Sequence, residues 1–254
     1  MSYIQITKNN IENEHICCAL GAKQYDKAVL EKKQWLTDRM DEGLVFYRLN
    51  ERAKVFIEYI PAEMAWVPIQ APNYMYINCL WVSGKYKENG YAKQLIDYCK
   101  EDAISRDMDG IVHITGKKKL PYLSDNRFFE HLGFEVVDQA EPYFQLMALK
   151  WHDYAVEPSF KTQLKISNVN NEGIAIYYTA QCPFAVGIVD ELKKVAENHK
   201  VPFKTHRITT TEQAQNAPTL WTTFGLFYNG KFITHEIMSP NKFDKLLSKL
   251  QIEQ

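Results

Sequence analysis

Gly90 and the residues around it have the types and spacing of a phosphate-binding turn. Residues 76–82 are rich in β-branched and aromatic side chains, as a largely covered strand requires. From Ala92 onward the apolar positions recur at helical spacing. The first N–H groups of such a helix have no partner inside it and carry partial positive charge. Because Gly90 lets the backbone lie close to a ligand, this turn is suited to hold a pyrophosphate.

Residues 87–92, Lys-Glu-Asn-Gly-Tyr-Ala, resemble the coenzyme A loop of the GNAT acetyltransferase superfamily. That loop follows the pattern Gln or Arg, two residues, Gly, one residue, Gly or Ala, and here Lys87 stands in the first position. A second resemblance lies downstream, where residues 128–134 read Phe-Phe-Glu-His-Leu-Gly-Phe, an aromatic helix end followed by Gly-Phe entering a strand. The two signatures occur in the family's order, with a strand-like Gly110 to Thr115 between them.

This resemblance implies an α/β (α+β) GNAT fold with a mixed sheet in the first half, and acetyl-CoA (coenzyme A) as cosubstrate without a metal. Pantetheine would lie along the backbone of Leu80, Trp81 and Val82. The implied reaction is direct attack of an amine on the thioester in a ternary complex, without an acyl-enzyme. The pyrophosphate would bind the turn and the helix start, at Lys85, Lys87, Glu88, Asn89, Gly90, Tyr91 and Ala92.

Acyl transfer to an amine needs a deprotonated amine, a polarised carbonyl and a protonated leaving thiolate. The family's usual general acid, a tyrosine four residues before the signature glycine, is Phe129 here, which has no proton to give. Tyr122 and Ser124 are the nearest hydroxyl candidates, and a water or an unassisted thiolate are the alternatives. The candidates for the base, two of them acting through a water, are Glu63 in a proline-rich loop, Glu58 on the preceding hairpin and Tyr76 on the cofactor strand.

Cys182 begins a predicted helix, where unpaired N–H groups favour a thiolate and lower the expected pKa. Ala185 occupies the position at which a dithiol oxidoreductase keeps its resolving cysteine. We therefore expect Cys182 to be the most reactive thiol and to form a mixed disulfide with a low-molecular-weight thiol. A thiol- or peptide-binding platform and a vestigial fold are the alternatives. The other cysteines are expected in the core (Cys79 and Cys99) or on a helix (Cys17 and Cys18).

The elements around the first site are expected in the order of the GNAT fold. Pro61 to Pro72 contains three prolines and is predicted to be a shaped loop, because proline cannot donate to a central sheet. The pattern predicts strands over 3–7, 44–50, 53–60, 76–82, 110–115, 134–137 and 143–150, and helices over 10–20, 25–40, from 92, and 121–132.

A break around Pro158 predicts a linker over 152–162, between a GNAT domain over 1–151 and a second domain over 163–254. The second domain is predicted to have strands over 173–178, 202–208, 220–227 and 231–236, and helices over 183–199 and 241–250. This order, with Cys-Pro-Phe at a helix start and Pro218 where a cis proline would stand, resembles the thioredoxin and glutaredoxin fold. The whole order is similar to GNAT proteins that carry a C-terminal YoaP-like domain.

The composition narrows the class of protein. A chain of 254 residues with 46% hydrophobic residues predicts two domains with real cores. The formal net charge of −1 predicts no nucleic acid and no anionic membrane partner. Residues 1–10 have no signal-peptide pattern and no run is long enough to span a membrane, so we expect a cytoplasmic protein. The five cysteines form no C-x-x-C pair, which argues against a disulfide framework or structural zinc.

The leading hypothesis is an acetyl-CoA-dependent N-acyltransferase with an accessory monothiol thioredoxin-like domain. The acceptor, an amine of a small molecule or peptide, is set by loops that the cofactor motif does not specify. The alternative is a thiol-binding or thiol-redox protein whose GNAT half is a CoA sensor or scaffold. A third reading is a catalytically silent interaction module. CoA binding separates the first reading from the third, and turnover separates a catalyst from a sensor.

Overall fold

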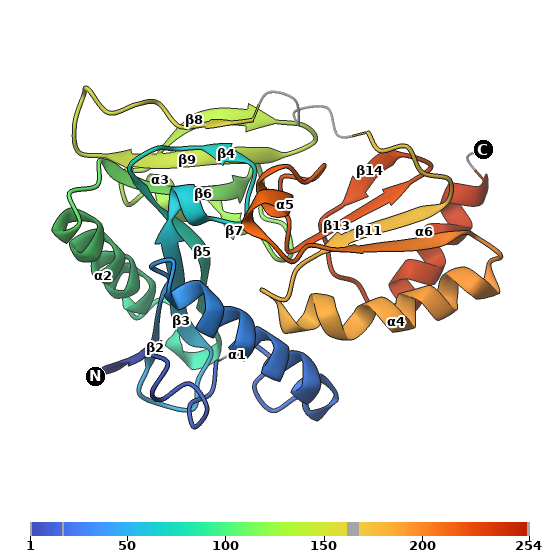
Figure 1. Cartoon of the computed structure of the whole chain (residues 1–254), viewed down its shortest axis with the longest axis horizontal. Helices are drawn as coiled ribbons and strands as arrows, with labels where there is room; N and C mark the ends of the chain where they lie inside the picture. The colour runs from blue at the N-terminus through green and yellow to red at the C-terminus, as the bar shows by residue number, and fades with distance from the viewer. Residues whose placement is uncertain (1, 17, 162–167, 253–254) are drawn as a thin grey trace.

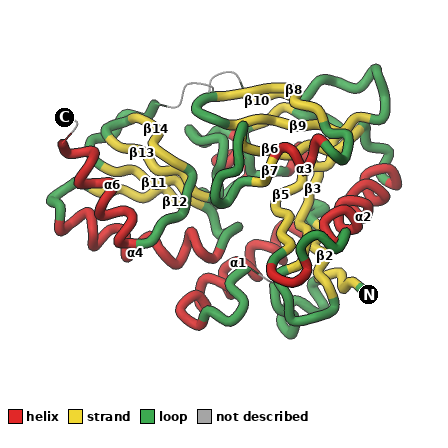
Figure 2. Tube along the Cα trace, turned by 180° about the vertical axis from the view of Figure 1, so that it is seen from behind, coloured by secondary structure: helices red, strands yellow, loops and turns green. Residues whose placement is uncertain are grey.

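The computed structural model describes residues 2–16, 18–161 and 168–252 and shows two main β-sheets side by side, each with its own helices (Figures 1 and 2). The larger sheet has the strand order β1-β2-β3-β5-β6-β9-β8, with β7 paired to β6. Only the β5–β6 and β6–β7 pairs in it are parallel. Its strands are β1 (Tyr3–Ile6), β2 (Val45–Leu49), β3 (Val55–Pro61), β5 (Tyr74–Val82), β6 (Gly110–Gly116), β7 (Ser124–Asp125), β8 (Glu135–Ala140) and β9 (Phe144–Lys150).

Helices cover both faces of the larger sheet. α1 (Asp26–Met40) buries Trp35 and Leu36 in one core, and α2 (Tyr91–Ser105) buries Leu95 and Ile96 in another on the opposite face. The buried side chains of Tyr91, Leu95, Cys99 and Ala103 recur every four residues along α2, which is the spacing that a one-sided helix requires. The remaining short elements are α3 (Asn126–Glu130) and the 3-10 turns η1 (Lys23–Tyr25), η2 (Ala62–Met64) and η3 (Gly84–Tyr86).

The smaller sheet has the order β12-β11-β13-β14, in which only β11 and β12 are parallel. Helices α4 and α6 pack together on one face, around Leu192, Phe243 and Leu247. The other face turns toward the first half, where Tyr177 and Phe232 join its core. The elements are β11 (Ile174–Tyr178), α4 (Pro183–Asn198), β12 (Phe203–Arg207), α5 (Thr211–Gln215), β13 (Phe224–Tyr228), β14 (Lys231–Thr234) and α6 (Pro240–Ile252).

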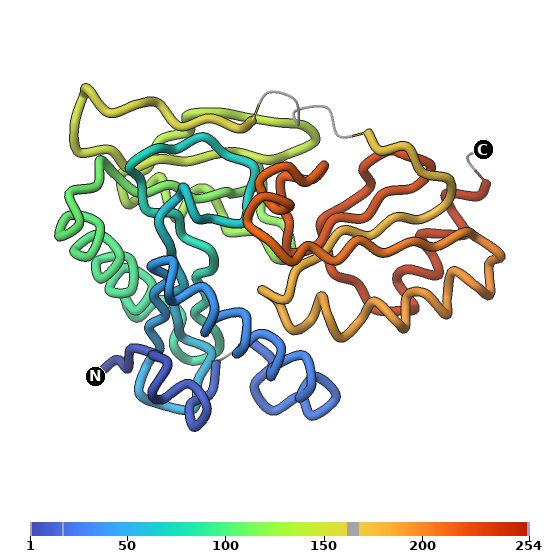
Figure 3. Tube along the Cα trace, in the orientation of Figure 1, coloured from blue at the N-terminus to red at the C-terminus, as the bar shows by residue number. Residues whose placement is uncertain are grey.

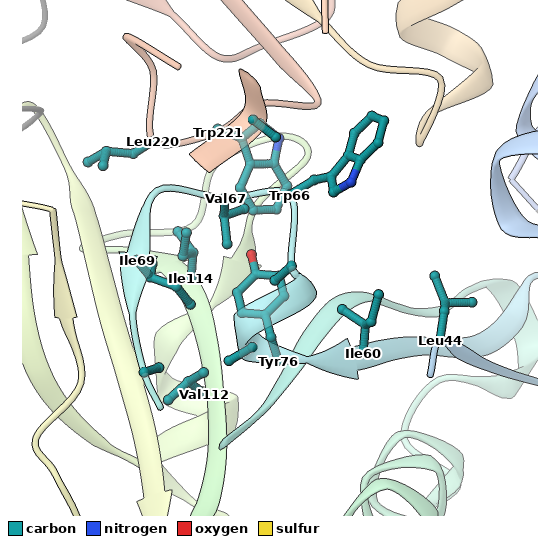
Figure 4. Packing of buried hydrophobic residues seen from close by; sticks show 14 of the residues in the cluster. Leu44, Ile60, Trp66, Val67, Ile69, Tyr76, Val112, Ile114, Leu220 and Trp221 are labelled. Atoms are coloured by element: carbon teal, nitrogen blue, oxygen red, sulfur yellow. The ribbon is translucent and has the colours of Figure 1, made fainter. Parts of the chain in front are cut away.

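A single hydrophobic cluster joins the two halves. Leu220 and Trp221 of the second half pack with Tyr76, Val67 and other core residues of the first (Figure 4). The segment around α5 reaches across to the proline-rich loop, as the orange and cyan tubes show in Figure 3. There Gln215 donates from Nε2 to the Glu63 carbonyl at 2.7 Å. The second half is therefore packed against the first over a shared core and is not a loosely tethered appendage.

Polar contacts fix the relative position of the halves. The Trp66 indole N–H donates to Thr211 Oγ1 at 3.0 Å. His235 bonds Tyr143 Oη at 2.6 Å through Nδ1 and the Pro121 carbonyl at 2.8 Å through Nε2. Because a carbonyl can only accept, the neutral ring carries its proton on Nε2, and Nδ1 accepts a hydrogen bond from the Tyr143 hydroxyl. His235 thereby holds the loop that leads into β7.

Two predicted helices of the first half are wrong in extent. Residues 10–16 and 18–20 form turns, because Asn10 bonds backward to the Thr7 N–H and the Gln5 carbonyl in place of capping a helix. The helix predicted over 121–132 shrinks to α3. Tyr122 has a φ of 62°, and Asp125 caps the helix by accepting from the Arg127 N–H, so the helix starts only after it.

The predicted linker and three features of the second half also need correction. Ser159–Phe160 forms β10, which pairs with β4 (Ile69–Gln70) and buries Phe160 against the first half. The segment 152–161 is therefore structured, and residues 162–167 lie outside the described part. Among the described peptide bonds the cis one precedes Pro142, not Pro218. The strand predicted from Leu220 begins only at Phe224, and the sequence pattern missed α5.

None of the helices in the described ranges has the length and hydropathy of a membrane span. The same residues contain no group of three or more His, Cys, Asp or Glu side chains that could hold a metal ion.

Candidate functional site

Strand β5 carries a bulge and a free edge. Tyr59 of β3 stands opposite Ile77 and Glu58 opposite Cys79, so Asn78 is an extra residue without a partner in β3. On its other side β5 pairs with β6 only over Tyr74–Tyr76. The backbone of 78–82 therefore presents unpaired groups toward β6, and an amide-containing chain such as pantetheine can add to that edge as a strand would.

The bulge also changes which side chains face the second half. Tyr76 lies in the core on the α1 face, and after the extra residue Cys79 and Trp81 lie on that same face. Leu80 and Val82 turn instead to the α2 face. Without the bulge the alternation would place Cys79 and Trp81 on the α2 side.

The turn after β5 keeps an open helix start. Gly90 caps α2 with a φ of 77°, a left-handed conformation that glycine adopts without strain, and a Cβ added there would meet no atom within 4 Å. The first helical hydrogen bond runs from the Gln94 N–H to the Gly90 carbonyl at 3.0 Å. Asn89 closes the turn by donating from Nδ2 to the carbonyls of Lys85 and Lys87. The residues fit a pyrophosphate at this end of the helix.

The predicted cofactor residues fall on three consecutive pieces of this region. Leu80, Trp81 and Val82 end β5 on its free edge, and Lys85 lies in η3. The side chain of Tyr91 is buried against Tyr86, with ring centroids 5.7 Å apart. Tyr91 is therefore the first residue of α2 and also packs in the core. Lys87, Glu88, Asn89 and Gly90 form the exposed part of the turn. Ala92 lies in the first turn of α2 and is partly exposed.

A cavity of about 540 Å³ opens between the two halves beside this edge. From the first half it is lined by the bulge, by Trp81, by Lys32 of α1 and by the loop that contains Tyr122. From the second half it is lined by residues before and at the start of α4, and by Trp221. The cofactor strand and the second half therefore share one site, which could not be predicted directly from the sequence.

His113 and Ser124 form a hydrogen-bonded pair at the wall of this cavity. His113 Nδ1 lies 2.8 Å from the Ile77 carbonyl and Nε2 lies 2.8 Å from Ser124 Oγ. Since the carbonyl fixes the ring proton on Nδ1, the Ser124 hydroxyl donates to Nε2. Burial lowers the pKa of His113 to about 4, against the opposing effect of the Ile77 bond, so the ring is neutral at pH 7. The Ser124 hydroxyl is thus engaged with His113, and its oxygen is free to accept a hydrogen bond from the cavity.

Sequence reasoning missed His113. Its only signal was a titratable residue inside the apolar strand Gly110–Gly116, which on sequence alone is as consistent with a core histidine as with a site residue. Tyr122, by contrast, does line the cavity and is partly exposed. Burial of its hydroxyl, with Cys182 and Tyr25 nearby, raises its pKa to about 12. Phe129 is fully buried, 4.6 Å from the His113 ring by centroids, and packs the core.

The candidate bases lie in different places. Glu63 is exposed outside the cavity, and its carboxylate accepts from the Asn73 N–H at 2.6 Å, so its position does not suit a base at this site. Glu58 is buried and paired with Lys32, with Nζ and Oε2 2.7 Å apart. Tyr76 is fully buried in the shared core, and burial raises the pKa of its hydroxyl. None of the three carboxyl or phenol groups lines the cavity.

Lys32 and three cysteines stand around one end of the cavity. Burial acts to lower the pKa of Lys32, but Cys18, Glu58 and Cys79 together raise it above its ordinary value, so the ammonium stays charged. Burial raises the pKa of Cys18 to about 12 and that of Cys79 well above its usual range. Lys32 is thus the charged group that faces the site.

Cys182 does stand at the N-cap of α4, yet its pKa is raised and not lowered. Burial is the largest cause, and it outweighs the Ala185 and Phe184 N–H groups and Lys32, which all act to lower the pKa. The expectation from helix-start placement was therefore wrong in direction, because burial was not visible in the sequence. Cys99 is buried under α2 with its pKa well above normal, and Cys17 lies outside the described residues.

Comparisons with known proteins give the family. The model described as Acetyltransferase (GNAT) family matches residues 9–134, and the model described as YoaP-like matches residues 202–245. A Bacillus subtilis (strain 168) protein named "Uncharacterized N-acetyltransferase YoaP" is 63% identical over 250 residues, covering 98% of this chain and 100% of that protein.

Two solved structures are similar at a lower level. An aminoglycoside 6'-N-acetyltransferase complexed with coenzyme A shares 15% identity and a TM-score of 0.44, over 59% of this chain and 97% of that chain. The PaiA N-acetyltransferase of Thermoplasma acidophilum in complex with coenzyme A shares 14% identity and a TM-score of 0.42, over 59% and 100%. On the family match and the full-length relative, the chain belongs to the GNAT acetyltransferase family, as an acetyl-CoA-dependent N-acetyltransferase with a YoaP-like C-terminal region.

Proposed function

We propose that the chain transfers an acetyl group from acetyl-CoA to an amine by direct attack in a ternary complex, at the bulge of β5. The observation that carries this proposal is the unpaired edge of residues 78–82, which leads from the open helix start at Gly90 to the cavity between the halves. Bound acetyl-CoA supplies an activated thioester there. The free edge would orient its pantetheine arm, and Asn78 at the bulge would place backbone groups beside the reacting carbonyl.

The polar side chains at the cavity then take distinct roles. Ser124 Oγ, whose proton is given to His113, would accept a hydrogen bond from the attacking amine and orient it. Tyr122 would donate a hydrogen bond to the leaving thiolate, since its pKa of about 12 keeps the hydroxyl protonated at neutral pH. With Glu63 outside the cavity, a water is the better proposal for the group that removes the amine proton.

For the second half we propose a thioredoxin-like fold that has no redox cycle of its own. Its support is the strand order β12-β11-β13-β14 with Cys182 at the N-cap of α4. Ala185, in the resolving position, is buried and carries no thiol. A low-molecular-weight thiol at Cys182 remains a proposed partner, and the free, buried thiols of Cys18 and Cys99 suit the reducing cytoplasm that we propose as the compartment.

Two linked measurements test the proposal. Calorimetry with CoA reports binding, and release of free CoA thiol from acetyl-CoA, in the presence of a panel of amines, reports turnover. We expect metal-independent binding and amine-dependent thiol release that a chelator does not inhibit. CoA binding without turnover by any amine, amino acid or peptide would favour the sensor or scaffold alternative instead.

A further inference from the structure

The second half supplies part of the wall of the cavity. Residues 180–184 turn from β11 into α4 and place Gln181 and Phe184 at the cavity, and Trp221 comes from the loop before β13. Opposite them stand Asn78 and Trp81 of β5. A ligand that reaches the bulge would therefore touch both halves. The wall is held rigidly, since the shared core and the bonds of Thr211 and His235 fix the halves together.

Two largely buried amides at this wall have no protein partner. Asn78 and Gln181 are 5% and 7% exposed, both line the cavity, and among the described residues nothing hydrogen-bonds to their side chains. The Trp221 indole N–H also lacks an acceptor, but it is completely buried and therefore lies in the packed core and not at the cavity. Leaving a buried donor or acceptor without a hydrogen-bond partner costs about 1–3 kcal/mol of folding stability. The two amides, gathered from both halves at one cavity, indicate a site built to bond a polar ligand.

The charge of the wall limits the kind of ligand. No Asp or Glu is among the described residues that line the cavity, and the one charged side chain there is the ammonium of Lys32. A polycation such as a polyamine or an aminoglycoside would lose hydration of several charges with no carboxylate to replace it. A single amine, which must be neutral to attack, has no such requirement.

The shape and surface of the cavity favour a flat apolar body. Trp81, Trp221 and Phe184 present aromatic surface, which ligand rings contact in stacked or edge-on geometry. The volume of about 540 Å³ is in the range of small-molecule sites, and it must also admit the end of the pantetheine arm. The remaining space suits a molecule of one or two rings.

We propose that the YoaP-like half forms the acceptor-binding wall of the acetyltransferase, and that the acceptor is a small aromatic monoamine with one carbonyl- or hydroxyl-type acceptor for the Gln181 amide. This inference rests on the proposed function, because it assigns the second substrate of the same site. It gives Gln181 the role of a specificity residue. The Asn78 amide then bonds a remaining polar atom of the acceptor.

The test uses two probes that differ by one group. L-Phenylalaninamide has the ring, the amine and a carboxamide, and phenethylamine lacks the carboxamide. In the full chain, Gln181→Leu keeps the size of the side chain and removes its amide. We expect it to raise the KM for L-phenylalaninamide about 3- to 10-fold, the worth of one neutral hydrogen bond. The KM for phenethylamine, kcat and the CoA dissociation constant should change little.

Gln145→Leu is the matched control. Gln145 is also buried and has an unpartnered side-chain oxygen, but it does not line the cavity. The control should leave the KM of both probes unchanged. Spermidine and kanamycin should not be acetylated by any of the proteins.

Three results would overturn the inference in a chain that binds CoA normally. They are no turnover of aromatic monoamines, a preference for spermidine or kanamycin, and a KM for L-phenylalaninamide that Gln181→Leu does not change. Calorimetric titration of L-phenylalaninamide without CoA reports the acceptor site alone. If wild-type protein binds this amine but not CoA, the proposed function fails while the acceptor site stands.

Discussion

The cofactor region and the acceptor cavity meet at β5 but are built in different ways. The cofactor region is one continuous piece of chain, from the edge of 78–82 through Gly90 into α2, and its turn is exposed. The acceptor cavity is buried and assembled from α1, β5, the loop before β7 and the second half of the chain. The first can be recognised from a short run of residues. The second exists only after the two sheets have packed together.

This difference explains why a family motif reports the cofactor and not the acceptor. The turn at Gly90 needs only a left-handed residue and a helix start, which local sequence specifies. The acceptor wall needs Trp221 to lie against Trp66 and Tyr76 in one core, across a large distance in sequence. The four predictions that follow test whether the two regions are separable, in order of expected effect.

Gly90→Glu should have the largest effect. A non-glycine residue at a φ of 77° is strained, and the new carboxylate would stand where the pyrophosphate binds. We expect CoA affinity to fall by about 10²-fold or more, because strain and charge repulsion add. Calorimetry with CoA measures this, while the affinity for L-phenylalaninamide should be unchanged.

Gly21→Glu provides the matched control, since Gly21 also has a positive φ of 81° and the nearest atom to an added Cβ is a flexible arginine tip 3.8 Å away. It lies in the N-terminal loops and should bind CoA normally if folded. Unchanged CoA affinity in a folded Gly90→Glu protein would refute the placement of the cofactor at this helix.

Tyr122→Phe and Ser124→Ala act at the contact between the two regions. Removing a general acid or an orienting hydroxyl costs about 10²-fold in kcat. We expect that loss for Tyr122→Phe and a smaller one for Ser124→Ala, with CoA affinity constant in both. Steady-state thiol release together with calorimetry separates turnover from binding. If neither change lowers kcat, water or unassisted departure of the thiolate is the better account.

Cys182 should be the most readily alkylated of the described cysteines, although slowly. Its pKa is raised by burial, so at neutral pH the thiolate fraction falls below that of an exposed cysteine. Cys18 and Cys99 are buried, and Cys79 has its pKa raised well above normal. Mass spectrometry after limiting iodoacetamide should find label at Cys182 first, with L-phenylalaninamide slowing it. Earlier labelling of Cys79 or Cys99 would contradict the burial seen here.

The smallest effect concerns pH. The pKa of His113 is about 4 in the folded chain and about 6.5 when exposed. As pH falls below 6.5 the unfolded chain binds a proton that the folded chain does not, so the free energy of unfolding decreases down to about pH 4. Urea unfolding at several pH values should show this slope, and it should be shallower in a folded His113→Asn variant. Equal slopes would mean that other groups dominate the acid response.

The sequence predicted much of the fold, because periodic apolar residues decided it. The edges of α1 and α4, the hairpin of β2 and β3, and the order of the longer strands follow from local patterns, whereas the two-residue strands β4, β7 and β10 were not predicted. The helix prediction over residues 10–20 was wrong. Asn10 can cap a helix or hold a turn, and only the tertiary structure selects the turn. The start of the helix predicted before Gly133 was wrong for a similar reason, since Asp125 caps the helix and α3 begins only after it.

The candidate site was predicted unevenly. The cofactor residues and Tyr122 needed only the motif and its neighbourhood, and they lie together. Glu63 stood in the right kind of loop, but that loop packs against α5 and leaves its carboxylate outside the cavity. The pKa of Cys182 depends on burial beneath the first half, and His113 acquires its partners only when β6 and β7 pair. Interactions between distant segments were the missing information in each case.

Hydrogen–deuterium exchange with and without CoA tests the central claim most directly. The claim is that backbone N–H groups of one continuous stretch bind the cofactor, while the second half serves the acceptor. CoA should slow exchange in residues 78–93 and leave β12 and β13 unchanged, because bonded amides exchange slowly. Protection confined to the second half, with residues 78–93 unaffected, would contradict the account.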